Sequence, residues 1–270
     1  MTKQNLYTFR RIVFLVIPTL ILLFVLIYIS AKNLFPEEAA ETGNISATDI
    51  PALTVEPTAV PERNGKVRLV VYHTHNDEAF YKGKQKYTES VKGRTDNSEY
   101  NVMRLGKDFA NSLNKSFDVT HDEANNMSNG FNYAYDTAYE NEKKYCGVKD
   151  VFVDIHRDAY SGENPNYAQK NSSEYALIKF VVANGSNFDK NPDWQKNKEY
   201  ADKITKELNK LVPGVASEPV FKDYRFNQHL GEVCLLAEIG NEKNTLTQAR
   251  NSAKLLAEAF NNAASDGWWK

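Results

Sequence analysis

The sequence is poor in cysteine and carries no large excess of charge. Its two cysteines, Cys146 and Cys234, are too few and too far apart for a disulfide framework or a thiolate metal site, so we expect two small core residues. The formal net charge is −2, and the chain after residue 65 contains no block of basic residues. Nucleic acid is therefore not an expected partner.

One long hydrophobic run lies near the N-terminus. Residues 12–31 are apolar except for Pro18, Thr19 and Ser30, and about 20 such residues cross the hydrocarbon core of a bilayer. Basic residues precede the run and acidic residues follow it, which places residues 1–11 in the cytoplasm and the remainder outside the cell membrane. A cleaved signal peptide is the alternative. The length of the run and the lack of an A-x-A site after it favour a retained, single-pass transmembrane helix.

Two segments of different composition follow the hydrophobic run. Residues 32–65 are rich in proline, glutamate, threonine and alanine and have almost no large apolar residue, which is typical of a flexible tether. Residues 66–270 are rich in aromatic and β-branched residues and are long enough to bury one core. The sequence therefore predicts one extracytoplasmic domain on a membrane anchor.

Short apolar runs alternate with helical patterns throughout residues 66–270. This alternation predicts an α/β fold, with a mostly parallel sheet and helices on both faces. The expected strands are residues 67–72, 117–120, 151–155, 176–183 and 233–239. Apolar residues recur at helical spacing within residues 102–113, 204–211 and 246–260, and Asn244 is the expected N-cap of the last helix. The aromatic-rich residues 131–145 predict a further helix packed on the sheet, with some rings beside a sugar or peptide groove.

Polar residues gather at the expected ends of three strands. Residues 73–78 (HTHNDE) follow the first strand, residues 154–158 (DIHRD) end the third, and Glu238 ends the last one. Ligands of open α/β sheets bind outside the carboxyl ends of the strands. We therefore expect the three groups to form one site.

The residue types at these strand ends suit a catalytic zinc ion. His75 and Glu78 have the spacing H-x-x-E, which lets an imidazole and a carboxylate from one turn bind the same metal, and His156 would supply a second nitrogen. Two nitrogens and one oxygen suit a zinc ion that keeps one position open for water. Glu238 is then the expected catalytic residue, as general base and general acid.

The remaining histidines and one further acid have other expected places. We expect His73 in the core or beside the ligands, His121 on a solvated loop, and His229 on the surface or at the edge of the cleft. Glu99 is expected to begin a helix, and it is the reserve candidate for the third ligand if Glu78 does not bind.

The motifs together resemble those of the stage II sporulation protein P family. In order, they are VYHTHNDE at 71–78, DIHRD at 154–158, FVV at 180–182 before NPDW at 191–194, NQ at 227–228, and EIGN at 238–241 before NTL at 244–246. The resemblance extends from residue 66 to the last helix. It implies a fold similar to zinc N-acetylmuramoyl-L-alanine amidases.

The resemblance also implies an activity and partners. The substrate would be peptidoglycan, cut at the amide between N-acetylmuramic acid and L-alanine of the stem peptide, in septal wall remodelling during sporulation engulfment. The implied partners are the stage II sporulation proteins D and M. We expect substrate contacts from Arg157, Asn227 and Gln228.

Two alternatives remain open at this point. A zinc carboxypeptidase or endopeptidase acting on stem peptides would also use an H-x-x-E motif, a distant histidine and a late glutamate. A carboxypeptidase needs an arginine for the free carboxylate of its substrate, such as Arg157 or Arg225. A non-catalytic wall-binding domain would have lost the metal, and the complete set of three candidate ligands and Glu238 argues against that loss.

Overall fold

The structure is a computed structural model that describes residues 65–81, 93–159, 166–185 and 194–269. The expected transmembrane helix at 12–31, and all of the expected tether except Gly65, lie outside these residues. Within the described ranges, no helix is both long and apolar enough to span a bilayer. The membrane anchor and the domain boundaries stay predictions.

A six-stranded sheet forms the centre of the described part of the chain, in the order β2-β1-β3-β8-β6-β7. In this order the strands are Phe117–His121, Val67–Tyr72, Val151–Asp158, Val233–Asn241, Ile178–Ala183 and Val220–Lys222. The first four run parallel to one another, β6 runs antiparallel to β8, and β7 runs parallel to β6. The expected α/β fold with a mostly parallel sheet is confirmed.

The single strand expected at residues 176–183 is in fact two strands. β5 (Ser173–Ala176) pairs with β4 (Tyr167–Lys170) in a separate antiparallel hairpin, and β6 begins at Ile178. Both Ala176 and Ile178 are fully buried. The apolar pattern therefore continues across the point where the chain leaves one sheet for the other, which hides the break in the sequence.

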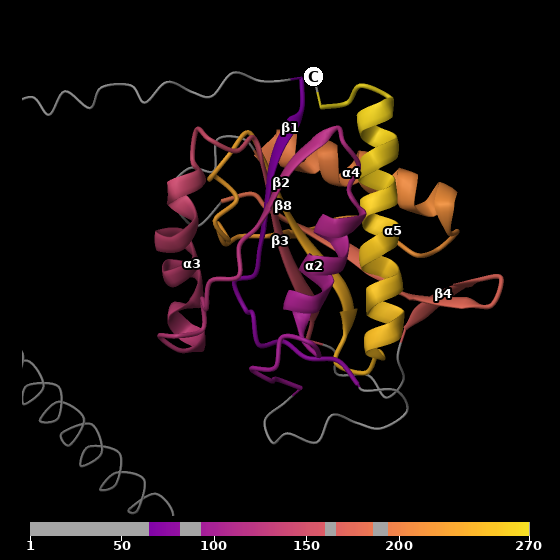
Figure 1. Cartoon of the computed structure of the whole chain (residues 1–270), viewed down its shortest axis with the longest axis horizontal. Coiled ribbons are helices and arrows are strands. Elements are labelled where there is room, and N and C mark those ends of the chain that lie inside the picture. Colours follow the sequence, from indigo (N-terminus) through magenta and orange to yellow (C-terminus); the bar gives the residue numbers. More distant parts are fainter. Residues whose placement is uncertain (1–64, 82–92, 160–165, 186–193, 270) are drawn as a thin grey trace, which may run out of the picture. The chain divides into compact units, whose positions relative to one another are not determined.

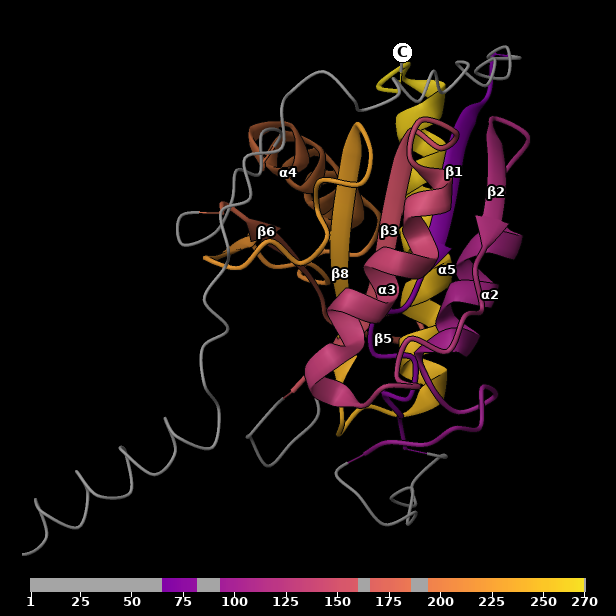
Figure 2. The same ribbon diagram turned by 90° about the vertical axis from the view of Figure 1, so that its left-hand side faces the viewer.

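Helices cover both faces of the sheet (Figure 1). On one face lie α2 (Val102–Ser112), α4 (Trp194–Leu211) and α5 (Leu246–Ser265), and on the other lies α3 (Ala134–Glu142) between the short helical turns η1 (Phe131–Tyr133) and η2 (Lys143–Tyr145). Figure 2 shows α3 in front of the sheet, running across β3. Successive side chains of β3 alternate between the two layers, so that Val153 packs with the three-helix layer and Phe152 packs with α3.

The sequence suggested Asn244 as the N-cap of α5, but the N-cap is Thr245. The hydroxyl of Thr245 accepts a hydrogen bond from the backbone N–H of Gln248, and the side chain of Gln248 accepts one from the backbone N–H of Thr245. Asn244 instead accepts a hydrogen bond from the backbone N–H of Asn241, at 2.9 Å. It thereby fixes the turn that follows β8.

Candidate metal centre

The three predicted ligands converge at the carboxyl edge of the sheet. One side-chain donor atom each of His75, Glu78 and His156 lies within 4.8 Å of the other two. Glu78 stands between the histidines, because its Oε1 is 3.6 Å from Nδ1 of His75 and its Oε2 is 3.4 Å from Nδ1 of His156. Within the described ranges, no other group of three or more such residues comes this close together.

The separation of these atoms fits a zinc ion. A tetrahedral zinc with ligands at about 2.0–2.1 Å requires its ligand atoms to lie about 3.4 Å apart. The two distances measured from Glu78 are 3.4 and 3.6 Å, one from each of its carboxylate oxygens, and one donor atom of each residue lies within 4.8 Å of the others. Two imidazoles and one carboxylate are also a donor set found in catalytic zinc sites. The residues present therefore fit the ion that the sequence suggested.

Glu78 is held in place by the strand that carries His156. Its Oε2 accepts a hydrogen bond of 2.9 Å from the backbone N–H of Arg157, the residue next to His156. Its own backbone N–H donates to the carbonyl of His75, closing a tight turn after β1. One carboxylate is thus fixed to both segments that bear the histidines.

Asp154 lies behind His156, on the side of the ring away from Glu78. Its Oδ2 lies 3.0 Å from Nε2 of His156, while Nδ1 of the same ring faces Glu78. Asp154 is itself fixed, because it accepts hydrogen bonds from the backbone N–H and the hydroxyl of Thr74, at 2.9 and 2.6 Å. A carboxylate on the far nitrogen of a ligand histidine sets the tautomer and the ring orientation. The sequence places Asp154 in the polar cluster but does not reveal this role.

The electrostatic balance of the site favours a cation. Burial by itself would lower the pKa of His156, but the carboxylates of Asp154 and Glu78 outweigh it and raise that pKa well above its ordinary value. Burial would raise the pKa of Glu78, yet His156 and His75 hold it well below its ordinary range. A field that attracts a proton to His156 also attracts a metal cation, which would take the proton's place.

Aromatic rings pack against the two candidate ligand histidines. Phe131 stacks on His75 with ring centroids 4.5 Å apart, and Tyr135 packs edge-on against His75 and parallel to His156. Phe131 and Tyr135 come from η1 and α3, which lie over this face of the sheet. They cover one side of the two imidazole rings. The aromatic-rich segment expected to lie beside the cleft therefore contributes two rings that contact the candidate ligands.

Glu238 lies beside His156 on the neighbouring strand. The two residues are paired in the parallel register of β3 and β8, so their side chains project from the same face of the sheet. Oε2 of Glu238 is buried and has no hydrogen-bond partner. Burial raises the pKa of Glu238 to about 7, with His156 opposing the effect and Glu78 and Asp158 adding to it. A carboxyl group with this pKa can accept and return a proton near neutral pH.

His73 and His121 form a separate pair in the layer under α2. Nδ1 of His73 lies 3.0 Å from the carbonyl of Ile155, and its Nε2 lies 3.0 Å from Nε2 of His121. His73 is thus a core residue, and burial lowers its pKa to about 3. The loop position expected for His121 was wrong, because it ends β2 with a side chain only 11% exposed. A Cβ on Gly106 of α2 would lie 2.3 Å from Nε2 of His73, so this helix needs glycine there.

Glu99 and His229 lie apart from the ligands. The side chain of Glu99 is 55% exposed and pairs with Arg104. It does not begin a helix as expected, since the N-cap of α2 is Asn101. The ring of His229 stacks on Tyr139 at 5.6 Å. Neither residue joins the cluster of His75, Glu78 and His156.

The three residues expected to contact substrate, Arg157, Asn227 and Gln228, form hydrogen bonds with the backbone of the protein. The guanidinium of Arg157 donates to the carbonyls of Ala79 and Gly93, at 2.9 and 2.8 Å. The amide of Asn227 donates to the carbonyl of Tyr135, and Gln228 bonds the carbonyl of Val181 and the N–H of Ala183 on β6. These bonds hold the frame of the site. A role in substrate binding stays a prediction for all three.

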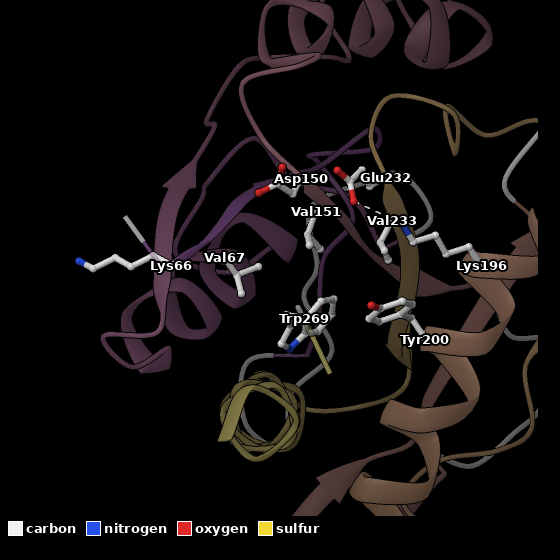
Figure 3. A pocket seen from close by; sticks show the side chains of 10 residues that line it. Lys66, Val67, Asp150, Val151, Lys196, Tyr200, Glu232, Val233 and Trp269 are labelled. Carbon is white, nitrogen blue, oxygen red and sulfur yellow. Dashed lines mark hydrogen bonds and ion pairs between the residues drawn. The ribbon is translucent and has the colours of Figure 1, made fainter. Parts of the chain in front are cut away.

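A cavity of about 290 Å³ lies at the opposite edge of the sheet, at the amino ends of β1, β3 and β8 (Figure 3). Among its charged residues, Lys196 lies 3.3 Å from Glu232 and Asp150 is bound to Arg68. None of the candidate ligands lines it. This cavity therefore offers no comparable metal site.

The comparison with known proteins decides the family. The sequence model of the family described as stage II sporulation protein P (SpoIIP) matches residues 30–261 of the chain. The chain belongs to this family. The resemblance drawn from the motifs is thereby confirmed for stage II sporulation protein P.

A curated member of the family is similar over most of the chain. Stage II sporulation protein P of Bacillus subtilis (strain 168) is 27% identical over 264 residues, which are 88% of this chain and 61% of that protein. The chain therefore spans about three fifths of the length of the curated relative.

Two solved structures of amidases match about three quarters of the chain. The N-acetylmuramoyl-L-alanine amidase of Clostridium difficile 630 has 15% identity and a TM-score of 0.46, over 74% of this chain and 98% of its own. The CwlD amidase of Clostridioides difficile, solved in complex with the GerS lipoprotein, has 15% identity and a TM-score of 0.48 over the same shares.

Proposed function

We propose that this member of the stage II sporulation protein P family is a zinc-dependent peptidoglycan hydrolase. It cleaves the amide between N-acetylmuramic acid and L-alanine of the stem peptide. The observation that carries the proposal is the convergence of His75, Glu78 and His156 within 4.8 Å, with Glu238 paired to His156 on the next strand. Membership of the family supports peptidoglycan as the substrate.

The residues of the site have separate tasks in this reaction. When bound to His75, Glu78 and His156, zinc would lower the pKa of a water ligand to about 7 and polarise the amide carbonyl. Glu238 takes one proton from the water that attacks the carbonyl carbon. It then gives that proton to the amide nitrogen as the C–N bond breaks, which leaves a lactyl carboxylate and the free amine of L-alanine. Asp154 keeps the His156 ring in the orientation that this requires.

The setting of the reaction is part of the proposal. Residues 12–31 would anchor the protein in the cell membrane, with the catalytic domain outside, and residues 32–65 would let that domain reach the wall. The enzyme would act in septal wall remodelling during sporulation. Stage II sporulation proteins D and M are the proposed partners.

Mass spectrometry of digested sacculi tests the activity. Purified protein with zinc should release stem peptides that begin with a free L-alanine and leave glycan strands with lactyl carboxylates. Release of a C-terminal amino acid would instead identify a carboxypeptidase, and loss of cross-links an endopeptidase. Binding of sacculi without cleavage or bound zinc would identify a wall-binding domain. The bonds of Arg157 to two backbone carbonyls weigh against its use as a carboxypeptidase arginine.

A further inference from the structure

A second, smaller cavity adjoins Glu238 on the side of β6. Its volume is about 190 Å³, and its polar lining consists of Asp158, Asn166, Lys179, Ser217, Glu238 and Asn241. Lys179 Nζ forms an ion pair with Asp158, with side chains 28% and 40% exposed. The expected general base, Glu238, and a partly exposed cation, Lys179, therefore line the same cavity.

The strand register places Glu238 between the metal ligands and Lys179. Glu238 is paired with His156 on β3 and with Lys179 on β6. Paired residues on neighbouring strands project from the same face, and neighbouring strands lie about 4.8 Å apart. His156, Glu238 and Lys179 therefore form one row across three strands.

The chemistry of the reaction decides which arm of the substrate lies at each end of this row. The amine that leaves must lie next to the acid that protonates it, so the peptide arm of the substrate lies on the Glu238 side of the scissile bond. One peptide residue spans at most about 3.6 Å, so a carboxylate one or two residues beyond L-alanine falls within reach of the Lys179 side chain. The sugar arm lies on the other side, towards the metal ligands.

We propose that this cavity binds the peptide arm of the substrate and that Lys179 pairs with a carboxylate of that peptide. The proposal rests on the proposed function. Lys179 is suited to this role because an ammonium group has three N–H donors, and because its partner Asp158 is 40% exposed, so that solvent weakens the ion pair. Arg157, the nearest alternative cation along β3, already donates to the carbonyls of Ala79 and Gly93.

The test compares two substrates that differ only in charge. They are soluble glycan strands bearing L-alanyl-D-glutamate side chains, and the same strands after their carboxylates have been converted to amides. For Lys179→Met we expect KM for the carboxylate substrate to rise roughly tenfold, the size of a charge-assisted hydrogen bond, with kcat nearly unchanged. KM for the amide substrate should not change. Lys222→Met, on β7 and outside the cavity, is the control for loss of one lysine and should leave both KM values unchanged.

Asp158→Asn separates anion binding from a merely structural ion pair. If Lys179 binds the substrate carboxylate, removal of the competing charge of Asp158 should lower KM for the carboxylate substrate, opposite to Lys179→Met. Changes in the same direction for both variants, or equal changes for both substrates, would overturn the proposal. A shift of the pH profile of kcat alone in Lys179→Met would show that Lys179 acts only through Glu238, and would also overturn it.

A binding measurement tests the role of Lys179 independently of the proposed function. If the wild-type protein cleaves neither substrate, the proposed function fails. Calorimetric titration of L-alanyl-D-glutamate into wild type and Lys179→Met would still test the cavity, because the variant should bind the peptide roughly tenfold more weakly than the wild type. Equal binding by both proteins, with unchanged melting temperatures, would refute the role of Lys179 whatever the activity.

Discussion

Oδ2 of Asp154 lies 3.0 Å from Nε2 of His156, on the side of the ring away from Glu78. This contact leaves Nδ1 as the nitrogen that faces the other candidate ligands. Two hydrogen bonds from Thr74 hold the carboxylate, so its position beside His156 is fixed by the buried contact between the end of β1 and β3.

Asp154→Asn should weaken zinc binding by about 10- to 100-fold, the usual effect of losing an orienting carboxylate behind a ligand histidine. Competition with a chelator of known affinity measures this. Asp108→Asn is a matched control, because Asp108 is also buried but lies on α2 and pairs with Arg250. It should lower the melting temperature and leave zinc affinity unchanged. If the Asp154→Asn protein bound zinc with wild-type affinity, Asp154 would not be needed to orient His156.

His156→Ala should abolish stoichiometric zinc, since it removes one of two nitrogen donors from a site with three protein ligands. Elemental analysis of the purified protein gives the metal content directly. His229→Ala serves as the control, because His229 stacks on Tyr139 outside the cluster. Full zinc content in the His156 variant would show that the ligands are other residues.

Glu238→Gln keeps the shape of the side chain but cannot take a proton. We expect the variant to fold and retain zinc while it cleaves the amide about 10² to 10⁴ times more slowly. Melting temperature, bound zinc and rate should be measured on one preparation. Near-normal turnover of the folded fraction would exclude Glu238 as general base.

Glu142 predicts a pH dependence of stability. It is fully buried at the end of α3 with both carboxylate oxygens unpartnered, and burial, with Asp122 adding to it, raises its pKa from 4.5 to about 8. Between these values the folded state keeps a proton that the unfolded chain releases. The free energy of unfolding should therefore fall as pH rises from about 4.5 to 8, by at most about 1.4 kcal/mol per pH unit, and level off above.

Glu142→Gln should flatten that decline and stabilise the protein at pH 8 more than at pH 5. Chemical denaturation across this pH range measures the effect. Glu140→Gln, two residues earlier and 62% exposed, should leave the profile unchanged. A profile that Glu142→Gln does not alter would mean that this carboxyl group is ionised in the folded protein.

The sequence predicts the convergence of His75, Glu78 and His156 because it reveals the parallel strands that end beside them. Apolar runs are visible in the sequence, and the carboxyl ends of parallel strands meet at one edge. The role of Asp154 is not visible, because it depends on the contact with Thr74, 80 residues away. That contact follows from the register of β1 and β3, in which Tyr72 and Asp154 are paired.

The direction of β6 and the place of the rings on α3 also escape the sequence. An apolar run such as residues 178–183 is compatible with a parallel or an antiparallel neighbour of β8, and only the path of the connection decides between them. Tyr135 fits a helix packed on the sheet, but its contact with both candidate ligand histidines depends on where α3 crosses the strands. Both features depend on long-range packing, which has no local pattern.

The row formed by His156, Glu238 and Lys179 limits how the length of this chain can change. Side chains alternate between the faces of a strand, so insertion or deletion of one residue within a strand turns every following side chain to the opposite face. In β8 such a change before Glu238 would direct its carboxylate into the layer of α4 and α5. Insertions and deletions that preserve activity should therefore fall in the connections between strands and not within β3, β8 or β6.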